Sequence, residues 1–388
     1  MLTRYHDKVS KGSMNNKRQQ ELLHTPEGVF DHYGRDAAEY DTVMEEMLSV
    51  IHSFGYENIK TPVFEFFDVF SREIGTTPSR ELYKFFDKEG NTLVLRPDFT
   101  PSVARCAAKY FMDDTNPIRF CYSGRAFVNT SNLQGKLKES YEMGAELINE
   151  GSVYADAEIL ASLIKSLLST GLTRFQITLG NVDYFRGICE AAGLSKDMEA
   201  ELRDVISAKN YYAAESLLLK QEVEKTYTEK FLRLTSFVRN DEDLEKEKES
   251  APNERAKSAL QRLIDVYHLL EDYGLSDYVS FDLSLLSKYH YYTGIIFKGY
   301  TYGVGDAVAT GGRYDKLLGY FGKEAPAIGY MISVDTLLEA LRMQKITIPV
   351  PENPVVVTWK GDGFREALSK AEALRKAGQR VILTKEED

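Results

Sequence analysis

The sequence predicts an α+β protein in which a mostly antiparallel sheet is flanked by helices. Short segments that combine apolar alternation with β-branched residues recur along the chain at 92–95, 118–122, 145–148, 175–179, 279–283, 294–297 and 327–332. Helical stretches such as 153–169 and 333–341 lie between them, without a regular strand–helix–strand repeat. This irregular order favours antiparallel pairing over a doubly wound parallel sheet.

Composition excludes several classes of protein. With 388 residues and 43% hydrophobic content, the chain can bury a large core spread over two or three domains. The net charge of −11 argues against a nucleic-acid partner, because binding to phosphates needs a basic face. No run approaches the roughly 18 apolar residues of a membrane helix, and the N-terminus lacks the apolar core of a signal peptide. We therefore expect a cytoplasmic protein.

The three cysteines are Cys106, Cys121 and Cys189. Their number is odd, their spacing is wide and their neighbours are apolar, so they indicate neither a disulfide framework nor a zinc site. We expect free thiols in the core, because an unpaired cysteine usually behaves as a small buried hydrophobe. The sequence suggests no other metal site and no cofactor.

The N-terminal part begins with residues 1–20, which are polar and basic and predict a mobile tail. Segment 36–54 then places apolar residues at three- and four-residue spacings, which predicts a helix ending at Gly55. Segment 59–65 predicts a strand, and its Pro62 restricts that strand to an edge or a distorted position.

The middle and the end of the chain differ from the rest in composition and in hydrophobic pattern. Segment 182–275 is charged, helix-forming and poor in strand signals, so it predicts a helical insertion in a domain made of 21–181 and 276–345. Its acidic run after Asp241 is typical of a solvated helix face. Residues 346–388 read as a proline-containing linker followed by strand 355–357, helix 363–377 and strand 381–383, which is one βαβ fragment.

Four motifs carry a resemblance to a known family: Leu-Arg-Pro-Asp-Phe-Thr-Pro at 95–101, Tyr-Tyr-Thr-Gly at 291–294, Gly-Gly-Arg-Tyr-Asp at 311–315 and Pro-Ala-Ile-Gly-Tyr at 326–330. In this order they resemble the histidyl-tRNA synthetase family of class II aminoacyl-tRNA synthetases over about residues 25–345. The first motif resembles the noncatalytic branch of that family, the regulatory subunits of ATP phosphoribosyltransferase. The resemblance implies the class II sheet, and it assigns segment 36–65 to motif 1, which builds a homodimer interface in the family.

Three positions depart from the synthetase pattern. Where the resemblance calls for arginine in motif 2, before Tyr291 and in motif 3, the chain has Val128, Ser287 and Thr336. Adenylate formation builds charge on a phosphate, and losing one group that stabilises such charge costs roughly 10²- to 10³-fold in rate. The sequence therefore predicts a protein that is not an enzyme and has no catalytic residues.

The resemblance implies a histidine pocket. Carboxylates at Asp98 and Glu142 with the Thr100 hydroxyl suit an ammonium group. Glu146 lies in an apolar strand, where a carboxyl group must pair or become protonated, and an imidazole N–H is a suitable partner. In the family's pattern the tyrosines at Tyr291, Tyr292 and Tyr314 contact the histidine ring, and small residues leave room for a ligand at Ala307, Ala309, Gly311 and Gly312.

The predicted pocket has fewer positively charged residues than acidic ones. In the synthetase the arginine replaced by Ser287 helps to hold the carboxylate of the amino acid, so Arg313, Lys288 and Lys136 are the candidates to replace it. Lys136 and Lys138 also keep positive charge in the motif 2 loop, which leaves binding of an anion or a nucleotide possible there.

The predicted function is a noncatalytic regulatory subunit of ATP phosphoribosyltransferase, with histidine as its effector. The resemblance implies assembly with the short-form catalytic subunit into a hetero-oligomer, and self-association into a homodimer. We expect no membrane partner and no tRNA partner, since the single βαβ fragment is too short for an anticodon-binding domain. The alternatives are a divergent histidyl-tRNA synthetase and a free-standing sensor of histidine or of a tRNA-like molecule.

Overall fold

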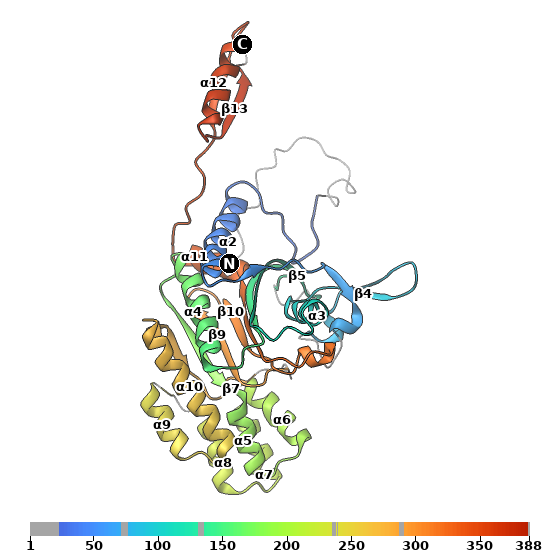
Figure 1. Ribbon diagram of the computed structural model, residues 1–388, viewed down its shortest axis with the longest axis vertical. Coiled ribbons are helices and arrows are strands. Elements are labelled where there is room, and N and C mark those ends of the chain that lie inside the picture. The colour runs from blue at the N-terminus through green and yellow to red at the C-terminus, as the bar shows by residue number, and fades with distance from the viewer. Residues whose placement is uncertain are drawn as a thin grey trace.

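The computed structural model describes residues 23–70, 77–130, 136–234, 238, 240–286 and 291–386. The predicted tail at 1–20, Ser287 and Lys288 lie outside the described residues. Figure 1 shows a central body, a helical segment at one end and a small C-terminal unit at the other.

The centre of the body is a sheet that contains eight strands within the described residues. Its order is β1-β5-β6-β11-β10-β9-β7-β8, and the strands are β1 Glu57–Asn58, β5 Ile118–Phe127, β6 Glu139–Ile148, β11 Ala327–Ser333, β10 Ala309–Arg313, β9 Ile295–Thr301, β7 Phe175–Asn181 and β8 Val279–Phe281. All inner pairs are antiparallel, while the outer pairs β1–β5 and β7–β8 are parallel. The predicted α+β class with a mostly antiparallel sheet is confirmed.

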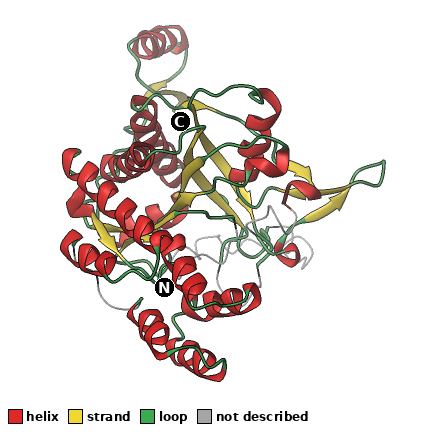
Figure 2. Cartoon of the chain, turned by 60° about the horizontal axis from the view of Figure 1, so that its bottom comes forward, coloured by secondary structure: helices red, strands yellow, loops and turns green. Residues whose placement is uncertain are grey.

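Helices pack against this sheet, as the red helices and yellow strands of Figure 2 show. They are α2 Arg35–Ser53, α3 Thr100–Tyr110, α4 Val153–Ser169 and α11 Val334–Met343. The 3₁₀ turns are η1 Phe67–Phe70, η2 Ser79–Glu81, η4 Ser276–Tyr278 and η5 Leu318–Phe321. Helix α4 buries nearly every apolar side chain because the sheet covers one side of it and α2 and α10 cover the others.

Asp335 ties two of these helices to the sheet. The hydroxyl of Tyr40 on α2 donates to Asp335 Oδ1 over 2.6 Å, and the backbone N–H of Tyr141 on β6 donates to Oδ2 over 2.6 Å. Asp335 lies in the first turn of α11, where a carboxylate also interacts favourably with the helix dipole. One carboxylate therefore fixes α2, β6 and α11 relative to one another.

The prediction of one continuous strand over 59–65 is wrong, because residues 59–63 are not in a strand. Residues 57–58 form β1, whereas β2 Phe64–Phe66 belongs to a second, three-stranded sheet with β4 Thr92–Leu95 and β3 Lys84–Phe86, in the order β2-β4-β3. Between β1 and β2, the Arg96 guanidinium donates to the carbonyl oxygens of Thr61 at 3.0 Å and Pro62 at 3.3 Å. Carbonyl groups held by a side chain are not paired with a neighbouring strand, and Pro62 has no N–H to donate.

The segment 182–275 is helical in its described part. It contains α5 Val182–Ala191, α6 Lys196–Ser207, α7 Tyr211–Lys220, α8 Lys225–Arg233, α9 Asp241–Glu249 and α10 Glu254–Asp272. Most of these helices begin at a capping side chain that accepts from a backbone N–H: Asn181, Ser195, Asn210, Asn240 and Asn253. The acidic run forms α9, in which Leu244 is buried and the charged side chains are exposed or half-buried.

The C-terminal unit consists of β12 Val355–Trp359, α12 Phe364–Lys376 and β13 Val381–Lys385, as the βαβ pattern predicts. The two strands are parallel, and the helix covers one face through a small cluster of its own that includes Val357, Ala367 and Ala371. In Figure 1 this unit stands apart from the body at the end of an extended segment.

The three cysteines are free thiols, with Cys121 and Cys189 buried and Cys106 half-buried. No helix within the described ranges combines the length and the apolar character that crossing a bilayer requires.

Gly144 on β6 provides a test of the packing. A Cβ at this position would lie 2.2 Å from the carbonyl oxygen of Tyr330 and 2.4 Å from the hydroxyl of Tyr122, both rigidly held. We expect Gly144→Ala to lower the free energy of unfolding by about 3 kcal/mol, because the sheet must shift to admit the methyl group. Gly305→Ala is the control, since nothing lies within 4 Å of its added Cβ. Urea unfolding that shows equal stability for the two variants would contradict the packing.

Candidate functional site

A cavity of about 240 Å³ opens in the body and brings the sequence motifs together. Its walls come from β5, β6, β10 and β11, from the segment before α3 and from the segment before β9. Most of the residues that the sequence predicted for the histidine pocket line it: Asp98, Thr100, Glu142, Glu146, Tyr291, Tyr292 and Tyr314. Segments separated by up to about two hundred residues therefore converge on one site.

Glu146 is the most enclosed acid of the cavity, with 1% of its surface exposed. Its Oε1 accepts from the Thr100 hydroxyl at 2.7 Å, and its Oε2 accepts from the Tyr314 hydroxyl at 2.5 Å. Burial raises the pKa of Glu146 to about 8, although both hydrogen bonds act to lower it. Position 329 must be glycine here, because a Cβ would lie 1.6 Å from Glu146 Oε2. The Pro-Ala-Ile-Gly motif therefore provides the space for this carboxyl group.

Asp98 and Glu142 have buried carboxylate oxygens that lack hydrogen-bond donors among the described residues. Neither carboxylate oxygen of Asp98 has a hydrogen bond within the described part of the chain, and Oε2 of Glu142 has none either. Burial raises the pKa of Asp98 to about 7, and the nearby Thr100 backbone N–H partly offsets this. Burial and the neighbouring Asp98 carboxylate raise the pKa of Glu142 well above its usual value. Orphaned buried acceptors of this kind indicate a ligand that donates hydrogen bonds and carries positive charge.

The tyrosines form one wall of the cavity. The rings of Tyr291 and Tyr292 lie 4.4 Å apart, and those of Tyr291 and Tyr314 lie 6.2 Å apart in an edge-on arrangement. Gly311 keeps the strand below them bare, because a Cβ there would lie 2.4 Å from the carbonyl oxygen of Gly329. A flat ring that enters the cavity would therefore meet aromatic faces on one side and backbone on the other.

Several lining residues were not identified from the sequence: Glu81, Tyr122, Thr310, Tyr330 and Met331. Tyr122 stacks on Phe99 with 4.3 Å between ring centroids. The alternation of strand 118–122 could have placed Tyr122 on one face of that strand. Its position opposite Gly144 depends on the β5–β6 register, for which the sequence carries no signal.

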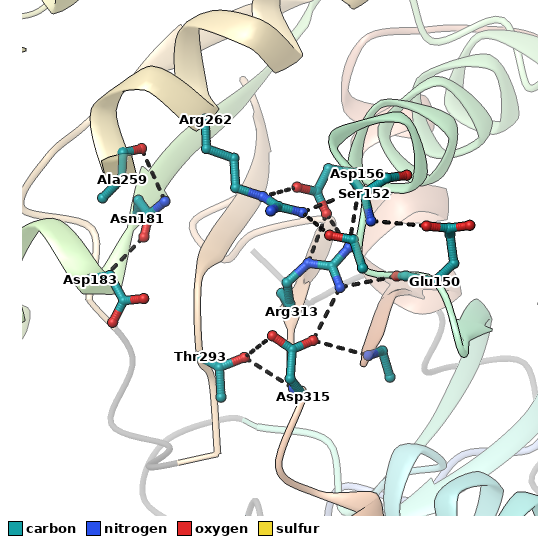
Figure 3. Close-up of polar contacts among 12 residues, drawn as sticks. Glu150, Ser152, Asp156, Asn181, Asp183, Ala259, Arg262, Thr293, Arg313 and Asp315 are labelled. Atoms are coloured by element: carbon teal, nitrogen blue, oxygen red, sulfur yellow. Dashed lines mark hydrogen bonds and ion pairs between the residues drawn. The ribbon is translucent and has the colours of Figure 1, made fainter. Parts of the chain in front are cut away.

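The structure corrects the prediction for Arg313. This side chain is buried but does not line the cavity. Figure 3 shows it extending toward Asp156 and Asp315. Its Nη2 donates to Asp156 Oδ1 at 2.6 Å, and its Nη1 donates to Asp315 Oδ1 at 3.1 Å. Because two carboxylates hold the guanidinium, Arg313 is not available to hold the carboxylate of a ligand.

Two of the three positions at which the sequence predicts a departure from the synthetase pattern lie within the described residues. Val128 lines the cavity and presents an apolar side chain there. Thr336 closes the first turn of α11, where its N–H donates to the Ser333 hydroxyl at 3.4 Å and the two hydroxyls lie 2.9 Å apart. Lys136 is exposed, and neither it nor Lys138 lines the cavity, so anion binding by these two residues stays a prediction.

The charge of the cavity decides what it can bind. Its described lining contains four acids, Glu81, Asp98, Glu142 and Glu146, and no lysine, arginine or histidine. Within the described residues no group of three metal-binding side chains is placed to hold a metal ion. A phosphate would meet only like charge in this lining, whereas an ammonium or imidazole group would find acceptors.

Comparisons with known proteins agree with this geometry. A family model described as histidyl-tRNA synthetase matches residues 28–337. The ATP phosphoribosyltransferase regulatory subunit of Acetivibrio thermocellus is 36% identical over 359 residues, which cover 92% of this chain and 86% of that protein. The protein of the same name from Caldanaerobacter subterraneus is 35% identical over 93% of this chain and 94% of its own length.

Solved structures show the same relationship. The chain matches an ATP phosphoribosyltransferase regulatory subunit/histidyl-tRNA synthetase from Bacillus halodurans with a TM-score of 0.86 and 30% identity, covering 94% of this chain and 93% of the other. It also matches histidyl-tRNA synthetase from Nostoc with a TM-score of 0.79 and 20% identity, covering 94% of this chain and 86% of that one. The second match shows a shared fold.

The orphaned carboxyl group of Asp98 predicts a pH-dependent stability. Its pKa is about 7 in the folded state, whereas an exposed aspartate has an ordinary pKa of 3.8. The folded state therefore binds more protons between these pH values, and stability falls as pH rises. In the ligand-free protein we expect Asp98→Asn to raise the unfolding free energy by roughly 1–3 kcal/mol at pH 8 and by little at pH 4. The exposed Asp306→Asn is the control. Thermal melts that show the same difference at every pH would contradict the assignment.

Proposed function

We propose a function from the premise that the chain belongs to the histidyl-tRNA synthetase family, in the branch of the ATP phosphoribosyltransferase regulatory subunits. In this proposal it is a noncatalytic regulatory subunit that assembles with a short-form catalytic ATP phosphoribosyltransferase. The assembly carries out the first step of histidine biosynthesis and is inhibited by histidine. The observation that carries the proposal is a cavity whose described lining offers buried acceptors for a cationic amino acid and no lysine, arginine or histidine for a phosphate.

Histidine fits the polar groups of the cavity. Its α-ammonium can donate to the Asp98 oxygens and to Glu142 Oε2, which have no partner in the described structure. Its imidazole can donate to Glu146, beside the wall of tyrosines. Because histidine carries a donor at each end of the molecule, the α-ammonium and the imidazole N–H, it satisfies acceptors that would otherwise stay buried and unpaired.

The same cavity does not favour aminoacyl-adenylate chemistry. Val128 lines the cavity, and the resemblance calls for the arginine of motif 2 at this position. The Thr336 hydroxyl lies within hydrogen-bond distance of the Ser333 hydroxyl at the start of α11. The third departure, Ser287, lies outside the described residues. A developing phosphate charge would need stabilising cations. tRNA is not among the proposed ligands, since the net charge is −11.

We also propose the domain division predicted from the sequence, 21–181 with 276–345, then 182–275 and 346–388. Its support is the sheet order. Strand β7 ends at Asn181 and its neighbour β8 begins at Val279, so the helical segment is inserted between two paired strands.

Co-expression with a short-form catalytic ATP phosphoribosyltransferase tests the function directly. We expect the two chains to copurify, and phosphoribosyltransferase activity to rise well above that of the catalytic chain alone. The matched measurement is histidine-dependent ATP–pyrophosphate exchange by this chain. Exchange above the no-protein control, without any effect on the transferase, would favour a divergent histidyl-tRNA synthetase instead.

Glu146→Gln tests histidine sensing. The amide keeps the shape of the side chain but replaces one acceptor by a donor, so an imidazole N–H loses its partner. We expect histidine binding to weaken by about 10- to 100-fold, which corresponds to 1.4–2.8 kcal/mol. The exposed Glu339→Gln on α11 is the control. Titration calorimetry and histidine inhibition of the assembled enzyme are the measurements. Equal affinity of the two variants for histidine would refute the placement of the imidazole beside Glu146.

The β2–β4–β3 sheet supports a homodimer. Its edge strand β2 exposes Phe64 and Phe66 with 53% and 57% of their surfaces accessible, although both are large apolar side chains. An exposed apolar edge strand is covered in stable proteins, and here a second copy would cover it. We expect Phe64→Glu with Phe66→Glu to convert a dimer to a monomer in sedimentation experiments at micromolar concentration. Tyr212→Glu, on α7, is the control, and a wild-type monomer would contradict the interface.

A further inference from the structure

The segment Tyr291–Gly294, here called the strap, carries two tyrosines of the cavity wall and leads into β9. Its side facing the cavity consists of Tyr291 and Tyr292. Two separate routes of hydrogen bonds connect the strap to the helical segment 182–275, and they end at Tyr292 and Thr293.

The first route is direct and begins on α5. Arg186 Nη2 donates to the carbonyl oxygen of Tyr292 over 3.2 Å. At the start of the same helix, the Val182 backbone N–H donates to the carbonyl oxygen of Gly294 over 3.0 Å. Helix α5 therefore holds both halves of the strap, and a shift of the helix would change the position of the Tyr292 backbone.

The second route begins on α10 and is shown in Figure 3. Arg262 Nε donates to Asp156 Oδ2 over 2.5 Å, and the same carboxylate accepts from Arg313 through Oδ1. Arg313 Nη1 continues to Asp315, whose Oδ2 accepts from the Thr293 hydroxyl over 2.9 Å. Four consecutive charged or polar pairs thus connect α10 to the middle of the strap.

Asp156 is the junction of this second route. It is fully buried, and it accepts from Arg313 of the sheet and Arg262 of the helical segment. Arg313 has 3% of its side chain exposed, whereas Arg262 has 29%. Removing Arg262 therefore leaves the Asp156 carboxylate paired with Arg313, so this substitution tests the link without leaving a buried charge unpaired.

A polar cleft lies between the helical segment and the strap, while the apolar side of α10 packs against α4. A cleft of about 420 Å³ separates α10 and the start of α5 from β10 and the strap, and charged side chains from both parts line it, among them Asp183, Arg262 and Asp315. A polar cleft bridged by ion pairs can change its geometry at lower cost than a packed apolar contact, in which every gap loses dispersion contacts.

We propose that Arg186 and Arg262 are positioning residues through which the helical segment sets the affinity of the cavity for its ligand. The strap moves toward the ligand with its tyrosines, and the two arginines hold it in the position that binds. Coupling between sites is reciprocal, so ligand in the cavity also tightens the helical segment. This inference rests on the proposed histidine-binding role. It adds that the helical segment 182–275 is the part of the protein that responds to the bound ligand.

The test compares Arg186→Met, Arg262→Met and both together with Lys248→Met. Lys248 on α9 is as enclosed as Arg186, with 16% and 20% of their side chains exposed, but its partners Gln261 and Glu245 both lie within the helical segment. Histidine titration should show about 3- to 10-fold weaker binding for each arginine variant and a larger loss for the double variant. Lys248→Met should stay within about twofold of wild type.

Hydrogen–deuterium exchange supplies a second readout, which a purely structural role would not change. Histidine should slow exchange in α5 and α10 of the wild type and of Lys248→Met, and it should fail to do so in the double variant. Thr293→Val removes the hydroxyl that binds Asp315 and should act like Arg262→Met, which keeps the test valid should an arginine variant fold poorly.

The outcomes separate the two ideas. Wild-type affinity and wild-type protection in both the double variant and Thr293→Val would overturn the coupling while leaving histidine binding intact. Failure of wild-type protein to bind histidine, alone and with its catalytic partner, would overturn the proposed sensing role and the coupling with it.

Discussion

A carboxyl group in the middle of an antiparallel sheet is the constraint on which the rest of the structure depends. Glu146 extends from β6 into a cavity where it accepts hydrogen bonds from Thr100 and Tyr314. The strand beside it must be bare at Gly329, because any side chain there would overlap the carboxyl group. Burying a carboxyl group costs several kcal/mol unless it is hydrogen-bonded or protonated. Here both oxygens accept hydrogen bonds, and burial raises the pKa of Glu146 to about 8.

The electrostatics of the cavity follow from that constraint. Once Glu146 is enclosed, the neighbouring Asp98 and Glu142 share the same poorly solvated space, and burial raises the pKa of each. A cation in the lining would neutralise them, yet the described lining contains no lysine, arginine or histidine, and Val128 presents an apolar side chain there. The cavity is therefore suited to a positively charged ligand, which would stabilise the ionised form of these carboxyl groups.

Outside the cavity, charge is used to join parts of the fold. Asp335 links α2, β6 and α11, and Asp156 links α4, β10 and α10. Both carboxylates are held by partners from distant segments, and each lies within a few residues of a strand or helix that supports the cavity. The regulatory role proposed for the chain needs such joints, because a ligand can act at a distance only through elements whose positions depend on its binding.

The sequence by itself determined the α+β class, most strand and helix positions and the motifs that surround the cavity. These features depend on local periodicity and on short spacings, as in the glycines before Tyr314 and the apolar strand around Glu146. Only the tertiary structure decided that Arg313 pairs with Asp156, that Tyr122 joins the lining and that the Asp98 carboxylate finds no hydrogen bond among the described residues. Arg313 and Asp156 are 157 residues apart in the chain. A partner at that separation is set by sheet register and helix packing, which leave no local pattern in the sequence.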